Sequence, residues 1–241
     1  MRWVAADLHI HTALSPCASE EMTPPAIVRE AVMRGLRLIA ICDHNSAENV
    51  VATQEAAGSE IAVLAGIEIT TAEDVHVLGV FPGADAARAA GCEVRAALPG
   101  AAARGGGQFL LDSRGAVVGR ESAMLAASSS LRLADATGLI RKHGGIAVAS
   151  HVDRPAFGVI GQLGLWPADA GFDAIEISAA GVAAGRDRNF EYVGLPMVTS
   201  SDAHDLGGIG SAYTLLRMAE EDFEAFAGAL QRELRRVCTH A

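Results

Sequence analysis

The chain alternates between short, continuous apolar runs and segments with helical periodicity. Apolar runs without polar alternation are typical of strands that are buried on both faces, as in parallel sheets. Such runs occupy residues 3–8, 36–41, 61–65, 74–80, 145–150, 173–177 and 196–200. The pattern therefore predicts seven buried strands.

Segments with helical signals lie between these runs. Thr23 suits an N-cap, Pro24 suits the first helical position, and Gly35 is a typical stop. Further helices are expected at residues 47–57, 134–143 and 219–236, with a short helical or loop segment at 155–163. The last helix has acids in its first turn and arginines in its last, which suits the helix dipole.

The pattern changes between residues 81 and 134, where alanine, glycine and serine dominate. Residues 108–118 have the alternation of a β-hairpin, with a turn at Asp112-Ser-Arg-Gly115. We interpret 81–134 as an insertion in the scaffold, because regular strand–helix alternation returns after it.

About seven strands alternating with helices in 241 residues suit one domain, residues 1–241, folded as a closed or nearly closed barrel. An open doubly wound sheet is the alternative fold. That fold needs a glycine-rich nucleotide loop after the first strand, and the sequence has His9-Ile-His11 there.

Composition narrows the function classes. The formal net charge of −10 argues against stable nucleic-acid binding through a broad basic face. Neither a signal peptide nor a membrane span is apparent, and the four cysteines have no framework spacing. We therefore expect a cytoplasmic protein with reduced thiols and no membrane partner. The oligomeric state is left open.

Metal-binding residue types follow the predicted strands, at the end where parallel barrels place their active sites. They are His9, His11, Asp43, His44, Glu68, His151, Asp202 and His204, and His76 lies inside the fourth run. A single histidine at a strand end is more often structural than a ligand. Six imidazoles with three carboxylates on one face would leave many buried polar groups to satisfy, so the set predicts a metal centre.

Several motifs in order resemble those of the PHP (polymerase and histidinol phosphatase) family. They are Asp7-Leu-His-Ile-His11, Asp43-His44, Gly66-Ile-Glu68, His76, His151 and Ser201-Asp-Ala-His204, which cover the chain apart from 81–134. The resemblance implies a distorted (β/α)7 TIM-like barrel, here with an inserted β-hairpin. It also implies two or three divalent ions, zinc, manganese or iron, in a cleft at the carboxyl ends of the strands.

Carried over by position, the resemblance implies three sites. His9, His11, Glu68 and Asp202 would hold the first ion; Glu68, His76 and His151 the second; and His44 and His204 the third. Cys17 lies nearest the remaining place in the third site, with Glu20 and Glu21 as alternatives, and its thiolate would favour zinc. Asp43 would be a weak ligand or would orient its neighbours.

The function expected from this ligand set is a metal-dependent phosphoesterase acting on a small phosphorylated molecule. Bound ions would make the cleft positive and would supply a bridging hydroxide as nucleophile. Besides Glu68, the catalytic candidates are Asp202 and His204, either of which could pass a proton to the leaving oxygen. Arg154 and Arg186 are candidate phosphate contacts.

Two other functions remain open on the sequence. One is an amidohydrolase-like hydrolase of a non-phosphate bond, but that class usually has a metal-bridging lysine after a middle strand. Lys142 is the only lysine, and it lies in a predicted helix. The other is a non-catalytic metal-binding module.

Overall fold

The computed structural model describes residues 1–100 and 107–232. Its strands are β1 (Arg2–Ile10), β2 (Leu38–Ile41), β3 (Ala62–Thr70), β4 (His76–Phe81), β5 (Phe109–Leu111), β6 (Val117–Arg120), β7 (Ile146–Ala149), β8 (Ala174–Ser178), β9 (Met197–Ser200) and β10 (Thr214–Met218). Each of the seven predicted runs contains a strand.

The helices are α1 (Pro24–Met33), α2 (Val50–Ala57), α3 (Ala84–Ala96), α4 (Leu133–Lys142), α5 (Val159–Leu163), α6 (Ala179–Ala183) and α7 (Phe223–Arg232), with short 3-10 segments at Ala168–Ala170, Arg186–Val193 and Leu206–Gly208. The helix expected at 219–236 begins only at Phe223, and residues 233–236 lie outside the described residues. None of the helices in the described ranges is both long and apolar enough to cross a membrane.

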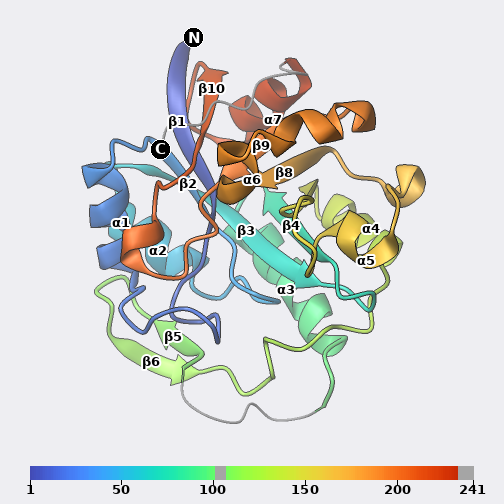
Figure 1. Cartoon of the computed structure of the whole chain (residues 1–241). Coiled ribbons are helices and arrows are strands. Elements are labelled where there is room, and N and C mark those ends of the chain that lie inside the picture. The colour runs from blue at the N-terminus through green and yellow to red at the C-terminus, as the bar shows by residue number, and fades with distance from the viewer. Residues whose placement is uncertain (101–106, 233–241) are drawn as a thin grey trace.

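Eight strands form one sheet in the order β10-β1-β2-β3-β4-β7-β8-β9 (Figure 1). The sheet curls until the end of β9 meets β1 again. The backbone N–H of His11 donates to the carbonyl of Ala203 at 3.0 Å, and Ile10 and Ala203 form a parallel bridge. The result is the predicted barrel, nearly closed by seven strands, with β10 added beside β1.

The strands are apolar on both faces because they separate two cores. In β2, Leu38 and Ala40 belong to the core inside the barrel, whereas Ile39 and Ile41 pack in the outer layer with α1 to α4. The inner core also contains Phe226 of α7. Helix α7 therefore covers the amino-terminal end of the barrel and leaves the opposite end for polar groups.

One expectation is corrected by β4, which is antiparallel to both β3 and β7. Only residues 71–75 join β3 to β4, and a parallel pair would need a crossover of a dozen residues or more. The reversal places His76, the first residue of β4, at the same end of the barrel as the carboxyl ends of the parallel strands. His76 is therefore no exception to the strand-end pattern.

Residues 81–134 contain two different structures. Helix α3 follows β4 directly and contributes Ala87, Ala90 and Val94 to the outer core, which the alanine-rich composition did not reveal. The predicted hairpin is confirmed as the antiparallel pair β5–β6, which forms a small separate sheet (Figure 1). Asn49 fixes this hairpin to the barrel by donating to the carbonyl of Phe109 and accepting from the N–H of Leu111.

Candidate metal centre

Eight polar side chains converge at the open end of the barrel. Each belongs to the end of a barrel strand or to the loop just beyond it, which the sequence predicted for all of them except His76. They form three groups in which one nitrogen or oxygen atom per residue lies within 4.8 Å of the others: His9, His11, Glu68 and Asp202; His44, Glu68 and His76; and His11, His44 and His204. His151 adjoins these groups through Glu68.

Glu68 is the centre of the cluster, and its side chain is only 1% exposed. Its Oε1 lies 2.9 Å from Nδ1 of His76 and 3.4 Å from Nε2 of both His9 and His151. Its Oε2 lies 3.0 Å from Nδ1 of His44 and 3.4 Å from Nε2 of His11. One carboxylate thus faces five imidazole nitrogens, an arrangement in which its two oxygens could bind different ions.

Several atoms of the cluster fit cations better than they fit one another. Both oxygens of Glu68, Nδ1 of His76 and Nδ1 of His151 are buried and have no well-aligned hydrogen bond from any described residue. The Nε2 atoms of His9 and His11 lie 3.1 Å apart, so two lone pairs would face each other without a proton or an ion between them. Buried polar atoms left unpaired in this way are costly, and divalent ions would satisfy them.

Electrostatics in the metal-free protein follow from this crowding. Burial alone would raise the pKa of Glu68, but His76, His9 and His44 outweigh it and hold that pKa well below its usual value. Burial would lower the pKa of His9, but the carboxylates of Glu176, Asp202 and Glu68 raise it well above its usual value. Metal binding must therefore displace protons from imidazoles, so metal affinity should fall as the pH is lowered.

Two ligand candidates have unusual backbone conformations. His151 and Asp202 have φ angles of 28° and 52°, in a region that residues other than glycine seldom adopt. Each is the second residue after a barrel strand, which is β7 for His151 and β9 for Asp202. Both side chains lie at the cluster, and backbone conformations of this kind are common at functional sites.

Asp43 lies behind the cluster and belongs to none of the three groups. Its carboxylate accepts from the backbone N–H and the hydroxyl of Thr12 and from the hydroxyl of Ser15, each at 2.7 Å. Ser15 Oγ is 2.9 Å from Nδ1 of His11. Because the single Ser15 proton goes to Asp43, Nδ1 of His11 must be the donor, which leaves Nε2 of His11 unprotonated. This geometry suits the orienting role for Asp43.

Cys17 approaches the third group. The nearest groups that act on its thiol are the imidazoles of His204 and His44. Desolvation alone would raise the pKa of this thiol, but the two imidazoles outweigh it and lower the pKa to about 6. Glu20 and Glu21 are the alternatives for this place. Like Cys17, they are exposed and belong to none of the three groups found among the described residues, but neither acts on the cluster histidines as Cys17 does.

The Cys17 thiol should react with iodoacetamide at low pH in the metal-free protein. We expect the alkylation rate to rise with pH around a midpoint near pH 6, and zinc to suppress the reaction. Mass spectrometry of the labelled peptides measures both effects, and exposed Cys92 serves as the internal comparison. A Cys17 midpoint above pH 8, or labelling unaffected by zinc, would contradict this placement.

The two candidate arginines lie in different surroundings. Arg154 Nη1 binds Oδ2 of Asp202, while Oδ1 of the same carboxylate lies 3.1 Å from Nε2 of His11. Arg186 instead pairs with Asp153 at 3.2 Å, and no described member of the cluster contacts it. Only Arg154 is thus at the edge of the cluster.

Glu176 was missed by the sequence analysis, although it is as buried as Glu68. Its oxygens lie 3.1 and 3.3 Å from Nδ1 of His9. The available signal was a single acid in the middle of the apolar strand Ala174-Ile-Glu-Ile-Ser178. An acid at an inward position of a barrel strand is costly unless it has a buried partner.

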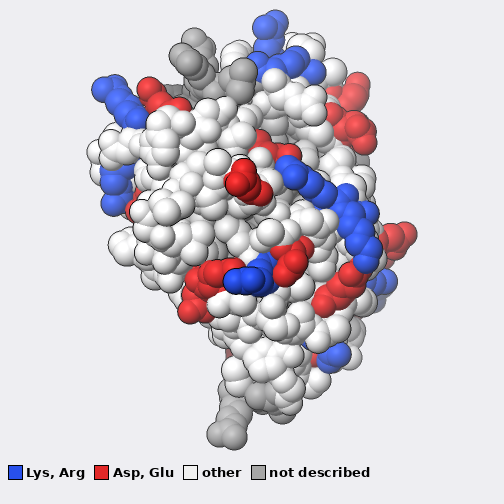
Figure 2. Space-filling view, turned by 90° about the vertical axis from the view of Figure 1, so that its right-hand side faces the viewer, with Lys and Arg blue, Asp and Glu red and all other residues white. Residues whose placement is uncertain are grey.

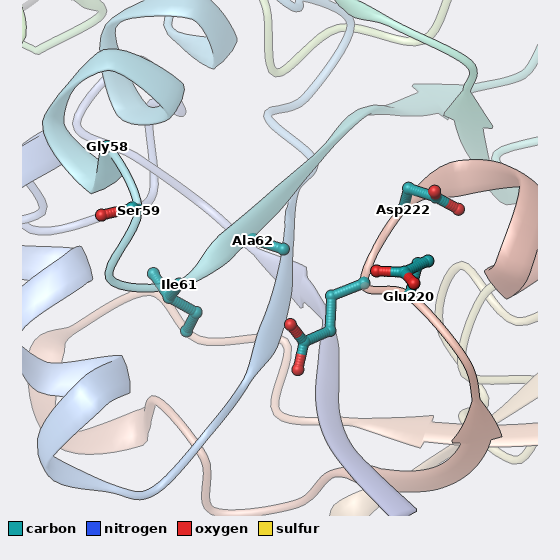
Figure 3. Close-up of a pocket in the computed structure, with 7 residues that line it drawn as sticks. Gly58, Ser59, Ile61, Ala62, Glu220 and Asp222 are labelled. Carbon is teal, nitrogen blue, oxygen red and sulfur yellow. The ribbon is translucent and has the colours of Figure 1, made fainter. Parts of the chain in front are cut away.

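A hollow at the other end of the barrel has different chemistry. Gly58, Ser59, Ile61, Ala62, Glu220, Glu221 and Asp222 line it (Figure 3). Three carboxylates would repel a phosphate, and Glu221 already pairs with Arg2 and Arg37. The histidine cluster is therefore the better candidate for an active site.

Comparison with known families agrees with this geometry. The sequence profile of the PHP domain matches residues 7–164, which is more than half of the chain, and the PHP-associated profile matches residues 187–233. The chain belongs to the PHP domain family. Its histidine, glutamate and aspartate cluster and this membership indicate a metal-dependent hydrolase.

Solved structures show the same fold at low sequence identity. A lesion-specific endonuclease from Pyrococcus furiosus is similar with a TM-score of 0.72 and 18% identity, over 96% of this chain and 56% of that one. A protein from Bifidobacterium adolescentis, provisionally described as a metal-dependent phosphoesterase, is similar with a TM-score of 0.60 and 20% identity. The match covers 95% of this chain and 96% of that one. An amidohydrolase from Chromobacterium violaceum with bound sulfate is similar with a TM-score of 0.59 and 22% identity, over 83% of this chain and 87% of that one.

These similarities establish the PHP fold and leave the substrate open. The chain spans little more than half of the length of the endonuclease. No curated protein is significantly similar to the chain.

Proposed function

We propose that this PHP domain protein is a metal-dependent phosphoesterase that hydrolyses a small phosphorylated molecule. The observation that carries the proposal is Glu68, a buried carboxylate facing five imidazole nitrogens at 2.9 to 3.4 Å. His9, His11, Glu68 and Asp202 would hold one ion, and Glu68, His76 and His151 a second. His44, His204 and Cys17 are available for a third.

Divalent ions in such a site lower the pKa of water and polarise a phosphoryl oxygen. The chain's own residues would bind the ester and manage protons. Arg154, at the edge of the cluster and 41% exposed, can donate to a phosphate oxygen. Arg186 is held by Asp153, and its contact with substrate would require that pair to open.

His204 is better suited than Asp202 to protonate the leaving oxygen. Burial would raise the pKa of Asp202, but His9 and His11 outweigh it and keep this carboxyl ionised. Burial would lower the pKa of His204, but Cys17 and Asp202 raise it. The raised pKa favours a proton on His204 in the metal-free protein, and its side chain is 29% exposed. With an ion on its free nitrogen, His204 would instead be a ligand.

The surface supports a small substrate over a long nucleic acid. The chain has a formal net charge of −10, and on the face shown in Figure 2 acidic and basic side chains are interspersed. Proteins that hold a nucleic-acid backbone usually present clustered lysine and arginine. Binding of a small phosphate ester requires positive charge only at the site itself, which the bound ions and Arg154 would supply.

A substrate panel tests this function. Purified protein with Mn²⁺ or Zn²⁺ is offered 4-nitrophenyl phosphate, a phosphodiester, an amide, a lactone and a DNA duplex with an abasic site. We expect release of 4-nitrophenol from the monoester, and loss of this activity by about 100-fold or more in His9→Ala, which lacks one ligand. His143→Ala, which removes a histidine paired with surface Glu93, should remain active.

Equal activity of the wild type and His9→Ala would refute the assignment. Cleavage of the amide or lactone without phosphate release would favour the amidohydrolase-like function. Incision of the abasic duplex with no activity on the monoester would show that the substrate is DNA and not a small molecule.

A further inference from the structure

Glu176 joins two of the elements that carry ligand candidates. It lies in the middle of β8, and its side chain is 1% exposed. Oε2 is 3.1 Å from Nδ1 of His9 and also accepts from the backbone N–H of His151 at 3.1 Å. One carboxylate therefore contacts both the His9 side chain on β1 and the chain at His151, just after β7.

The protonation of His9 follows from this contact. An ionised carboxylate can only accept hydrogen bonds, so Nδ1 of His9 must carry a proton. The other nitrogen, Nε2, lies 3.3 Å from Oδ1 of Asp202 and 3.4 Å from Oε1 of Glu68. A histidine binds a metal through an unprotonated nitrogen, and Nε2 of His9 faces the other ligands of the first site.

We propose that Glu176 is a positioning residue of the metal centre. It keeps the Nδ1 proton of His9 in place, so that Nε2 is the nitrogen presented to the first ion, and its negative charge strengthens that nitrogen as a ligand. It also fixes the start of the loop at His151, a ligand candidate of the second site. Glu176 itself belongs to none of the three groups, and its oxygens face Nδ1 of His9 rather than Nε2.

His11 is held in the same way but less directly. Its Nδ1 reaches Asp43 only through the hydroxyl of Ser15. Both histidines of the first site thus present Nε2. The carboxylate of Glu176 holds His9 directly, and Asp43 holds His11 through the hydroxyl of Ser15. Since direct hydrogen bonds to an ionised acceptor are about twice as strong as neutral ones, His9 depends more on its partner than His11 does.

The chain offers a matched control for Glu176. Asp173, just before the same strand, accepts from the backbone N–H of Ala147 on β7 at 2.9 Å. Both acids therefore tie β8 to β7, but Asp173 lies at the opposite end of the strand and contacts no ligand candidate. Asp173→Asn removes the same charge without touching His9.

The test measures zinc binding and histidine protonation rather than catalysis. Wild type, Glu176→Gln, Glu176→Met and Asp173→Asn are stripped of metal and titrated with Zn²⁺ against a chelating dye. We expect the tightest dissociation constant to rise about 10- to 100-fold in both Glu176 variants and to stay unchanged in Asp173→Asn. Long-range proton–nitrogen spectra should show His9 with zinc on Nε2 and a proton on Nδ1 in the wild type, and a smaller population of this form in Glu176→Met at the same zinc concentration.

Several outcomes would overturn the proposal. If Glu176→Gln binds zinc as tightly as the wild type, the proposal is wrong. This variant is also the test to use if Glu176→Met fails to fold. An equal loss of affinity in Asp173→Asn would mean a general effect of destabilising β8. The inference rests on the proposed metal centre and not on the substrate, so absent phosphatase activity with intact zinc binding would leave it standing.

Discussion

Glu68→Gln should lower kcat/KM for phosphate release by about 1,000-fold or more, which corresponds to about 4 kcal/mol of lost transition-state stabilisation. The carboxylate of Glu68 faces imidazole nitrogens with both oxygens: Oε1 toward His76, His9 and His151, and Oε2 toward His44 and His11. Glutamine keeps the shape but replaces one oxygen by an amide N–H₂ group, which cannot bind an ion. The one remaining amide oxygen has no negative charge and would bridge the first two sites poorly, and the second site would lose its only acidic ligand.

The measurement is steady-state hydrolysis of 4-nitrophenyl phosphate in saturating Mn²⁺ or Zn²⁺, so that weaker metal binding alone does not set the result. Glu93→Gln is the matched control, because Glu93 is a surface acid paired with Lys142 and His143 far from the cluster. Activity of Glu68→Gln within tenfold of the wild type would show that Glu68 does not bridge catalytic ions.

Removal of metal should lower the melting temperature by about 10 °C or more. An ion present at 100 times its dissociation constant stabilises the folded state by about 2.7 kcal/mol, so two ions contribute about 5 kcal/mol. For a chain of this size, about 1 kcal/mol corresponds to about 2–4 °C. The large effect follows from the buried cluster, where Glu68, His76 and His151 carry polar atoms without aligned partners among the described residues.

Differential scanning calorimetry with and without a chelator, followed by metal replacement, measures this shift. The control is His9→Ala, whose melting temperature should respond less to zinc because the first site is incomplete. A wild-type melting temperature that is the same with chelator and with zinc would show that the cluster is satisfied without ions.

The sequence predicted the positions of the buried strands and the residues that end them. These features are local: an apolar run is visible in a window of five to seven residues, and a histidine after it is visible at once. Spaced motifs in the right order then indicated the PHP family, which the profile match to residues 7–164 confirmed.

The features that sequence reasoning missed depend on pairing between distant segments. The reversal of β4 is set by the short connection from β3 and by its partner β7, and β10 exists because it pairs with β1. The hydrogen bonds of Asp43 depend on Thr12 and Ser15, and Glu176 acquires its partner His9 only when the curled sheet brings β8 close to β1. Neither contact produces a periodic signal in the chain.

The measurement that tests the central claim most directly is a crystal structure of the zinc-loaded protein with phosphate, using anomalous scattering to locate the metal. Two strong zinc peaks are predicted on either side of Glu68, one held by His9, His11 and Asp202 and the other by His76 and His151. A phosphate between them should contact Arg154. Absence of zinc from this cluster at neutral pH, with Glu68 hydrogen-bonded only to protein groups, would contradict the account.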